Sequence, residues 1–177
     1  MSKAKVATIW LDGCSGCHMS FLDMDERLVD LANKIDVVYG PYVDMKEFPS
    51  DVDLTLVEGA VANEHDLEKI LEVRKHSKMV VSFGDCAVTG NIPAMRNQFG
   101  VQAVFDRGYY ENVTEGPRTP DESIPALLEK VKPVHQVIEV DLHIPGCPPE
   151  ADTIYYALSE LLAGRTPDLT GKTRFGK

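Results

Sequence analysis

Four cysteines carry most of the chemical information in this 177-residue sequence: Cys14, Cys17, Cys86 and Cys147. Four thiolates suit zinc or an iron-sulfur cluster, because both bind soft sulfur in a tetrahedral arrangement, whereas calcium and magnesium bind oxygen. Structural zinc commonly uses two close pairs of cysteines, and this sequence has one close pair. A cubane cluster has four separate iron corners and takes ligands from scattered loops. The spacing therefore favours a cluster over zinc.

Two other interpretations of the cysteines stay open. The Cys14-Ser-Gly-Cys17 segment alone is typical of a redox dithiol, and scattered cysteines are often small buried core residues.

Gly16 allows the backbone to approach closely, so that amide N–H groups can point at anionic sulfur atoms. Cys147 is followed by Pro148, as in the Cys-Pro that ends many cluster-binding segments.

Strand-like and helix-like segments alternate along the chain, which predicts an α/β sheet. Apolar runs closed by Gly, Pro or Asp predict strands at 5–10, 35–39, 53–58, 78–83 and 136–142. Helical periodicity predicts a first helix through Phe21, Met24, Leu28 and Leu31. A second helix is predicted to begin at the N-cap Asn63 and to bury Leu67, Ile70 and Leu71. A last helix is predicted from Ile154 to Leu162.

The predicted strands place the cysteines together. The Cys14/Cys17 pair follows the first strand, Cys86 follows the fourth and Cys147 follows the fifth. Because the carboxyl ends of parallel strands share one edge of an open sheet, we expect the four thiols to converge there. Glu58 ends the third strand and is expected at the same edge.

Length and composition limit the classes of function. The length predicts a single domain spanning 1–177. The net charge of −10 disfavours nucleic acid and membrane surfaces as partners, and the apolar runs are far shorter than the roughly 20 residues that span a bilayer. The N-terminus lacks the pattern of a secretory signal, so we expect a cytoplasmic protein with reduced cysteines.

Four motifs together resemble a known family: Asp12-Gly-Cys-Ser-Gly-Cys17, Val57-Glu-Gly-Ala-Val61, Phe83-Gly-Asp-Cys-Ala-Val-Thr-Gly90 and Ile144-Pro-Gly-Cys-Pro-Pro149. The chain resembles, over essentially its whole length, the small electron-transferring subunit of nickel-iron hydrogenases, in the short form found in soluble NAD-reducing enzymes. The resemblance implies a flavodoxin-like open parallel sheet with helices on both faces. It also implies one 4Fe–4S cluster, a nickel-iron site in a separate large subunit, and partner iron-sulfur and flavin (diaphorase) subunits that reduce NAD.

Carried over by this resemblance, the cluster ligands are Cys14, Cys17, Cys86 and Cys147. The related quinone-oxidoreductase subunit of respiratory complex I has adjacent cysteines at the first ligand position, whereas two residues separate them here. Longer small subunits carry further cysteines in a C-terminal extension, and none follows Cys147, so one cluster is expected. Many of those subunits also have a glutamate where this chain has Met19, which removes that position from any proton relay.

The sequence leaves nucleotide cofactors to other chains. No Gly-x-Gly-x-x-Gly segment follows the first strand and no Walker loop is present. The cysteine pair also takes the position of a flavodoxin phosphate loop, so we expect neither NAD nor FMN to be bound by this chain. The five histidines are scattered, and none is assigned as a ligand.

Glu58 is the one further candidate site residue. We hypothesise that Glu58 carries protons or offers an oxygen ligand to an oxidised cluster. A carboxylate beside an anionic cluster is electrostatically unfavourable, and its presence there suggests a function. The competing explanation is a solvated strand end or a cap on helix amides. Residues 100–123 show no clear periodicity, and we expect this long segment to dock a partner. A stand-alone 4Fe–4S carrier and a complex I-like quinone oxidoreductase subunit remain the alternative functions.

Overall fold

The main element of the fold is a five-stranded parallel sheet. The structure is a computed structural model that describes residues 3–176. The strands lie in the order β2-β1-β3-β5-β7. Counted along the chain within this sheet, that order is 2-1-3-4-5, the flavodoxin-like arrangement, which confirms the predicted fold class. The strand bounds are β1 (Ala4–Trp10), β2 (Ile35–Tyr39), β3 (Val52–Glu58), β5 (Ser77–Phe83) and β7 (Leu142–Ile144).

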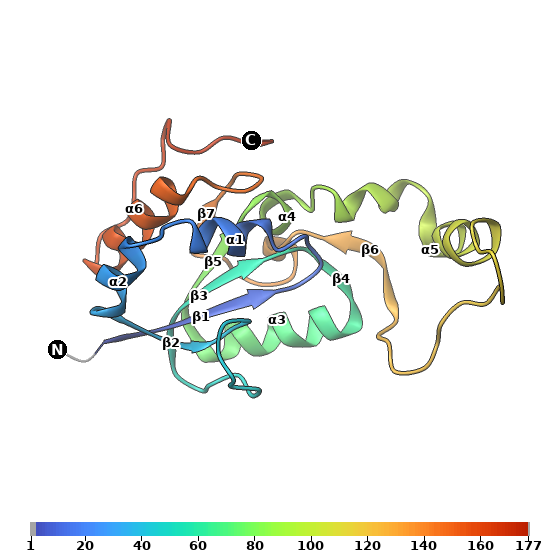
Figure 1. Cartoon of the computed structure of the whole chain (residues 1–177), viewed down its shortest axis with the longest axis horizontal. Helices are drawn as coiled ribbons and strands as arrows, with labels where there is room; N and C mark the ends of the chain where they lie inside the picture. Colours follow the sequence, from blue (N-terminus) through green and yellow to red (C-terminus); the bar gives the residue numbers. More distant parts are fainter. Residues whose placement is uncertain (1–2, 177) are drawn as a thin grey trace.

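Helices cover both faces of this sheet, and Figure 1 shows α3 and α6 on opposite sides of it. Successive strand residues point to opposite faces, so Val80 packs in one buried cluster and Val81 in the other. The Val81 cluster includes side chains of α1 (Gly16–Leu22), α2 (Arg27–Ala32) and α6 (Ala151–Leu162). The Val80 cluster includes side chains of α3 (Glu64–His76), α4 (Asp85–Thr89) and the 3-10 helix η3 (Val134–Gln136).

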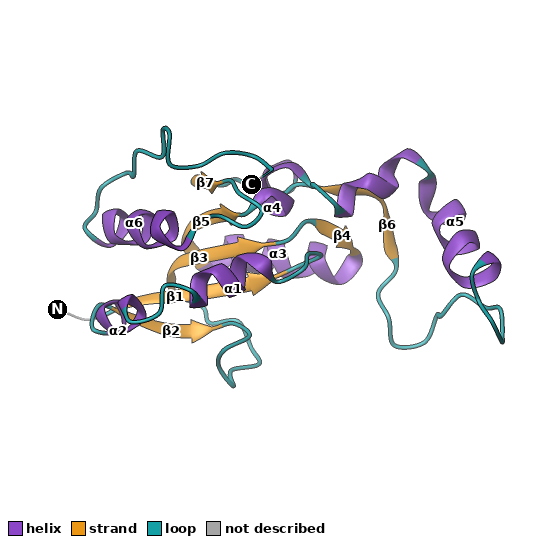
Figure 2. Ribbon diagram, turned by 45° about the horizontal axis from the view of Figure 1, so that its top comes forward, coloured by secondary structure: helices purple, strands orange, loops and turns teal. Residues whose placement is uncertain are grey.

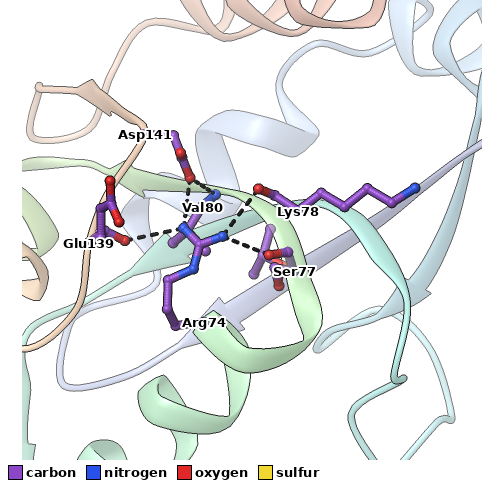
Figure 3. Close-up of polar contacts among 7 residues, drawn as sticks. Arg74, Ser77, Lys78, Val80, Glu139 and Asp141 are labelled. Carbon is purple, nitrogen blue, oxygen red and sulfur yellow. Dashed lines mark hydrogen bonds and ion pairs between the residues drawn. The ribbon is translucent and has the colours of Figure 1, made fainter.

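Arg74, in the last turn of α3, connects that helix to the sheet and to the segment before β7 (Figure 3). Its guanidinium donates to the carbonyl oxygens of Ser77 at 2.6 Å and Glu139 at 3.2 Å, and to the Asp141 carboxylate at 2.7 Å. The same carboxylate accepts the backbone N–H of Val80 at 2.7 Å. These charge-assisted contacts hold residues 139–141 beside β5.

The fifth predicted strand was placed wrongly along the sequence. The segment 136–142 was expected to be a strand, whereas residues 134–136 form η3 and the strand β7 covers only Leu142–Ile144. Ile138, within the predicted strand, is buried as a strand prediction requires, but it packs with Val134 and the α3 residues Ile70 and Val73 and is not part of a strand. Apolar content alone does not distinguish these two ways of burial.

The first predicted helix is two short helices. α1 ends at Leu22 and α2 begins at Arg27, and between them Asp25 has a positive φ of 50°, a backbone conformation that interrupts a right-handed helix. The apolar periodicity survives the break, because Met24 and Leu31 are both buried in one cluster with Phe21. The second helix begins at Asn63 as predicted, with the Asn63 side chain accepting the Asp66 N–H; Ile70 is buried, but Leu71 is exposed.

Residues 93–132 form an extension beyond the main sheet, and Figure 2 shows α5 and the loop after it reaching away from the sheet past β6. The segment 100–123 shows no clear periodicity in the sequence, yet its first half is helical. β4 and β6 pair antiparallel. The elements are β4 (Val61–Asn63), the 3-10 helix η1 (Pro93–Gln98), α5 (Gly100–Phe105), the π-helix η2 (Asp106–Glu111) and β6 (Leu127–Lys132).

Candidate functional site

The four cysteines lie on three loops at the carboxyl edge of the parallel sheet. Cys14 and Cys17 lie between the end of β1 and the first turn of α1, Cys86 lies in α4 directly after β5, and Cys147 follows β7. Cys17 is buried, Cys86 is half-buried, and Cys14 and Cys147 are exposed. The site adjoins the junction of β1 and β3, where the strand order reverses and where open α/β sheets place their ligands.

Gly84 lets the innermost thiol lie against the sheet edge. A Cβ built on Gly84 would lie 2.1 Å from the Sγ of Cys17, so only glycine fits between that sulfur and the end of β5. Gly84 also has a φ of +87°, which L-residues rarely adopt. Gly16 is close to the second sulfur of the pair, since its Cβ would lie 3.2 Å from the Sγ of Cys14. The glycines of two motifs therefore form a cradle around thiol groups.

The thiols are close enough to influence one another's ionisation. Burial raises the pKa of the Cys17 thiol far above its usual range, and the nearby Glu58, Cys86, Cys14 and Cys147 raise it further. Burial also raises the pKa of the Cys86 thiol to about 11, with added contributions from Cys147, Cys14 and Glu58. Four thiolates and a carboxylate in one place repel each other, so this donor set suits a bound cationic centre that displaces the thiol protons.

Nitrogen donors contact the sulfur atoms of Cys14 and Cys147. The backbone N–H of Gly16 donates to the Sγ of Cys14 at 3.4 Å. The side-chain amide of Asn91 lies 3.5 Å from the Sγ of Cys147, and a backbone hydrogen bond from Ile92 lowers the pKa of the Cys86 thiol against the effect of burial. Such donors stabilise negatively charged sulfur.

Glu58 is buried beneath this edge, with 1% of its surface exposed. Its carboxylate accepts the backbone N–H groups of Cys17 at 3.4 Å and His18 at 3.0 Å, and it contacts the Nδ1 of the buried His18 ring. Tyr42 covers the pair by donating its hydroxyl to the His18 carbonyl oxygen at 2.6 Å, and burial together with Glu58 raises the pKa of Tyr42 to about 12. Glu58 thus holds the first turn of α1, the helix that carries Cys17.

Asp85 joins two of the cysteine loops. It is 3% exposed, and its carboxylate accepts the N–H of Gly146 at 2.7 Å and the N–H of Gly176 at 2.7 Å. The Asp85 N–H in turn donates to the Gly146 carbonyl oxygen at 2.8 Å. The loops of Cys86 and Cys147 are therefore locked together by two reciprocal hydrogen bonds.

His18 and Asp85 were not among the site residues predicted from the sequence. The only signal was that each is a charged or titratable residue directly beside a cysteine at a predicted strand end. Their partners are 40 and 61 residues away in the chain, so periodicity could not reveal them. Within residues 3–176, no three Cys, His, Asp or Glu side chains are grouped to hold a single metal ion, and no helix there is long and apolar enough to cross a membrane.

The fold and the site together define a flavodoxin-like α/β protein whose cysteine-bearing loops meet at the carboxyl edge of the sheet. Residues 14–161 match the family described as NADH ubiquinone oxidoreductase, 20 Kd subunit, and the chain belongs to this family. All four cysteines lie within the matched range.

Relatives within the family are hydrogenase subunits. The chain is 41% identical to the NAD-reducing hydrogenase HoxS subunit delta of Cupriavidus necator, over 94% of this chain and 82% of that protein. It is 42% identical to a subunit of the F420-non-reducing hydrogenase vhu of Methanocaldococcus jannaschii, over 95% of this chain but 59% of that longer protein. These relatives confirm the resemblance to hydrogenase small subunits.

A solved structure agrees with this relationship along nearly the whole chain. The chain superposes on one chain of a crystal structure of a NAD+-reducing [NiFe]-hydrogenase in the H2-reduced state with a TM-score of 0.94 and 38% identity, covering 98% of this chain and 99% of that one. A [NiFeSe]-hydrogenase chain from Dm. baculatum matches with a TM-score of 0.62 at 22% identity and shares the fold.

Proposed function

We propose that Cys14, Cys17, Cys86 and Cys147 hold one 4Fe–4S cluster. The observation that carries this proposal is the placement of the four cysteines on three loops at one sheet edge. A cubane cluster with four thiolate ligands supplies one-electron transfer. Gly84 leaves the space that the Cys17 sulfur occupies, and the nitrogen donors at Cys14 and Cys147 fit the net negative charge that a cluster carries when its four thiolates are counted.

The protein's part in this function is to position the thiols and exclude water. Cys17 lies in the same buried cluster as Phe21 and Phe83, so the inner side of the site is closed to water, with the Glu58 carboxylate as a buried charged group beside it. The exposed Cys14 and Cys147 lie at the outer side. Electrons would therefore enter and leave from the open edge of the sheet, where a partner could cover the site.

We infer that the chain serves as the electron-transfer small subunit of a cytoplasmic nickel-iron hydrogenase. In this role it relays electrons between a nickel-iron large subunit and iron-sulfur and flavin subunits that reduce NAD, and it binds neither NAD nor FMN itself. The names of the relatives support this assignment, since the HoxS delta subunit and the superposed chain both belong to NAD-reducing hydrogenases.

Exposed apolar side chains support an association with partner subunits. Ile92, Met95 and Phe99 are each more than half exposed and lie within ten residues of the end of α4, the helix that carries Cys86. Large exposed apolar residues gathered beside a site are typical of a protein interface. The helical part of 100–123 follows directly after η1, which carries Met95. We propose that the segment 100–123 docks a partner.

For Glu58 we propose a role in coupling the cluster to protons or, when the cluster is oxidised, in offering an oxygen ligand. Its burial and its contact with the first turn of α1 support a close connection to Cys17. The same contacts support the simpler explanation that Glu58 only accepts helix amides, so a variant must separate the two.

Metal analysis of the complex, purified anaerobically from its native source, tests the proposed function. We expect about four irons and four sulfides per copy of this chain at the site, a brown colour, and co-purifying nickel and flavin subunits. The Cys147→Ala variant should lose that iron, whereas the control Ser159→Ala, on α6, should keep it. A colourless zinc protein with full activity would refute the cluster, and a fully soluble native monomer without nickel would favour a stand-alone carrier. Co-purification with quinone-reducing subunits would favour the complex I-like alternative.

A further inference from the structure

The turn after α4 brings a side-chain nitrogen donor to a sulfur atom on a different loop. The helix ends at Thr89, and Gly90, with a φ of +86°, donates its N–H to the Cys86 carbonyl oxygen at 2.9 Å. Asn91 then has a φ of +32°, and its backbone N–H donates to the Thr89 hydroxyl at 3.3 Å. This reversal of the chain turns residues 91 and 92 back toward the cysteine loops.

From this turn the Asn91 side chain reaches the loop after β7. Its amide nitrogen lies 3.5 Å from the Sγ of Cys147, across 56 residues of sequence. The side chain that makes this contact belongs to the turn after the Cys86 helix α4, so it joins that turn to a different cysteine loop. The turn that follows the Cys86 helix therefore contacts the sulfur atom of the Cys147 loop.

The Cys147 loop does not depend on Asn91 for its position. The reciprocal hydrogen bonds between Asp85 and Gly146 already join that loop to the Cys86 loop, at 2.7 and 2.8 Å. The contact of Asn91 with Cys147 is instead a single neutral donor placed on a sulfur atom. Its main effect is expected on the charge at that sulfur and not on the fold.

We propose that Asn91 is a positioning residue that raises the reduction potential of the cluster by donating a hydrogen bond to the Cys147 sulfur, an inference that rests on the proposed 4Fe–4S site. Reduction adds one electron to the cluster and its four thiolates. A donor that faces a ligand sulfur stabilises the more negative, reduced form more than the oxidised form, and so raises the potential. Loss of the donor lowers the potential, and a carboxylate in its place lowers it further.

Two variants at this position separate an electronic role from a structural one. Asn91→Gly removes the donor and tolerates the positive φ. Asn91→Asp keeps the size of the side chain and also tolerates positive φ, but it replaces the donor with a charged acceptor. The matched control is Asn33→Asp, the same charge change at the exposed end of α2.

The experiment is a potentiometric titration of the anaerobically purified complex, monitored by electron paramagnetic resonance, with iron counted in each sample. We expect full iron content and midpoint potentials that fall in the order wild type, Asn91→Gly, Asn91→Asp, with Asn33→Asp equal to wild type. Equal potentials in all four proteins at full iron content would overturn the role of Asn91 and leave the cluster in place. Loss of iron in Asn91→Gly would also overturn it, since Asn91 would then be needed for assembly. If the wild-type complex lacks this cluster, the proposed function fails instead.

Discussion

Replacement of Gly84 by alanine should abolish cluster binding while leaving the sheet intact. The added Cβ would lie 2.1 Å from the Sγ of Cys17, where ordinary contacts are 3.4–4 Å, so the sulfur would have to move by more than 1 Å. Metal–ligand distances tolerate only about 0.2 Å. Gly84 also has a φ of 87° and a ψ of 161°, a region almost restricted to glycine, and an alanine there costs about 1–3 kcal/mol of folding free energy.

The measurements are iron and sulfide per chain, the visible absorbance of the cluster, and urea unfolding of the metal-free protein. The control is Gly164→Ala, because Gly164 has a φ of +73° but no atom within 4 Å of the added Cβ. The control should show a loss of stability of about 1–2 kcal/mol with full iron content, whereas Gly84→Ala should lose its iron. Wild-type iron content in Gly84→Ala would refute the reasoning, because it would mean that the Cys17 sulfur is not held against the end of β5.

Three further perturbations test the core, a surface carboxylate and Glu58. Leu158→Ala, at a side chain of α6 that is 1% exposed, should lower the free energy of unfolding by about 2–5 kcal/mol in urea titrations, and an unchanged midpoint would contradict the packing. Asp53→Asn should destabilise the metal-free chain at pH 6, because hydrogen bonds from Lys78 and Lys5 lower the pKa of the native carboxyl. The difference in unfolding free energy between wild type and variant should shrink as pH falls below about 4 and vanish below the lowered native pKa. A difference that stays constant with pH would argue against the ion pair of Lys78 with Asp53. Glu58→Gln should keep the iron but change the pH dependence of hydrogen turnover or the recovery of activity after oxygen exposure. The control is Glu64→Gln, on α3. If Glu58→Gln matches wild type in both measurements, Glu58 is only an acceptor for helix amides.

Much of the parallel sheet could be predicted from local pattern. The strands expected at 35–39, 53–58 and 78–83 agree with β2, β3 and β5 to within one residue at each end. The inner strands β3 and β5 are mostly buried, whereas the edge strand β2 buries only Ile35. All three appear in the sequence as short, largely apolar runs closed by Gly or Pro. Once the strands are known, the carboxyl edge follows, and with it the common location of the cysteines.

Local pattern failed where tertiary contacts decide the conformation. The buried residues of 134–141 pack beneath α3, held by Arg74 and Asp141, and this removes them from the expected strand. β4 and β6 were not foreseen, because their pairing joins residues more than 60 positions apart. The break between α1 and α2 depends on the conformation of Asp25, which apolar periodicity does not encode.

The sequence by itself determined which atoms are available for chemistry and at which end of the sheet they lie. Residue type and strand periodicity are local properties, so Cys14, Cys17, Cys86 and Cys147 could be assigned to one edge without coordinates. Only the tertiary structure decided what surrounds those sulfur atoms, such as Gly84 beneath Cys17 and Asn91 beside Cys147. The physical reason is that hydrogen bonds and close packing depend on distances of a few tenths of an ångström between segments remote in the chain, and these are set only when the whole sheet and its helices are packed.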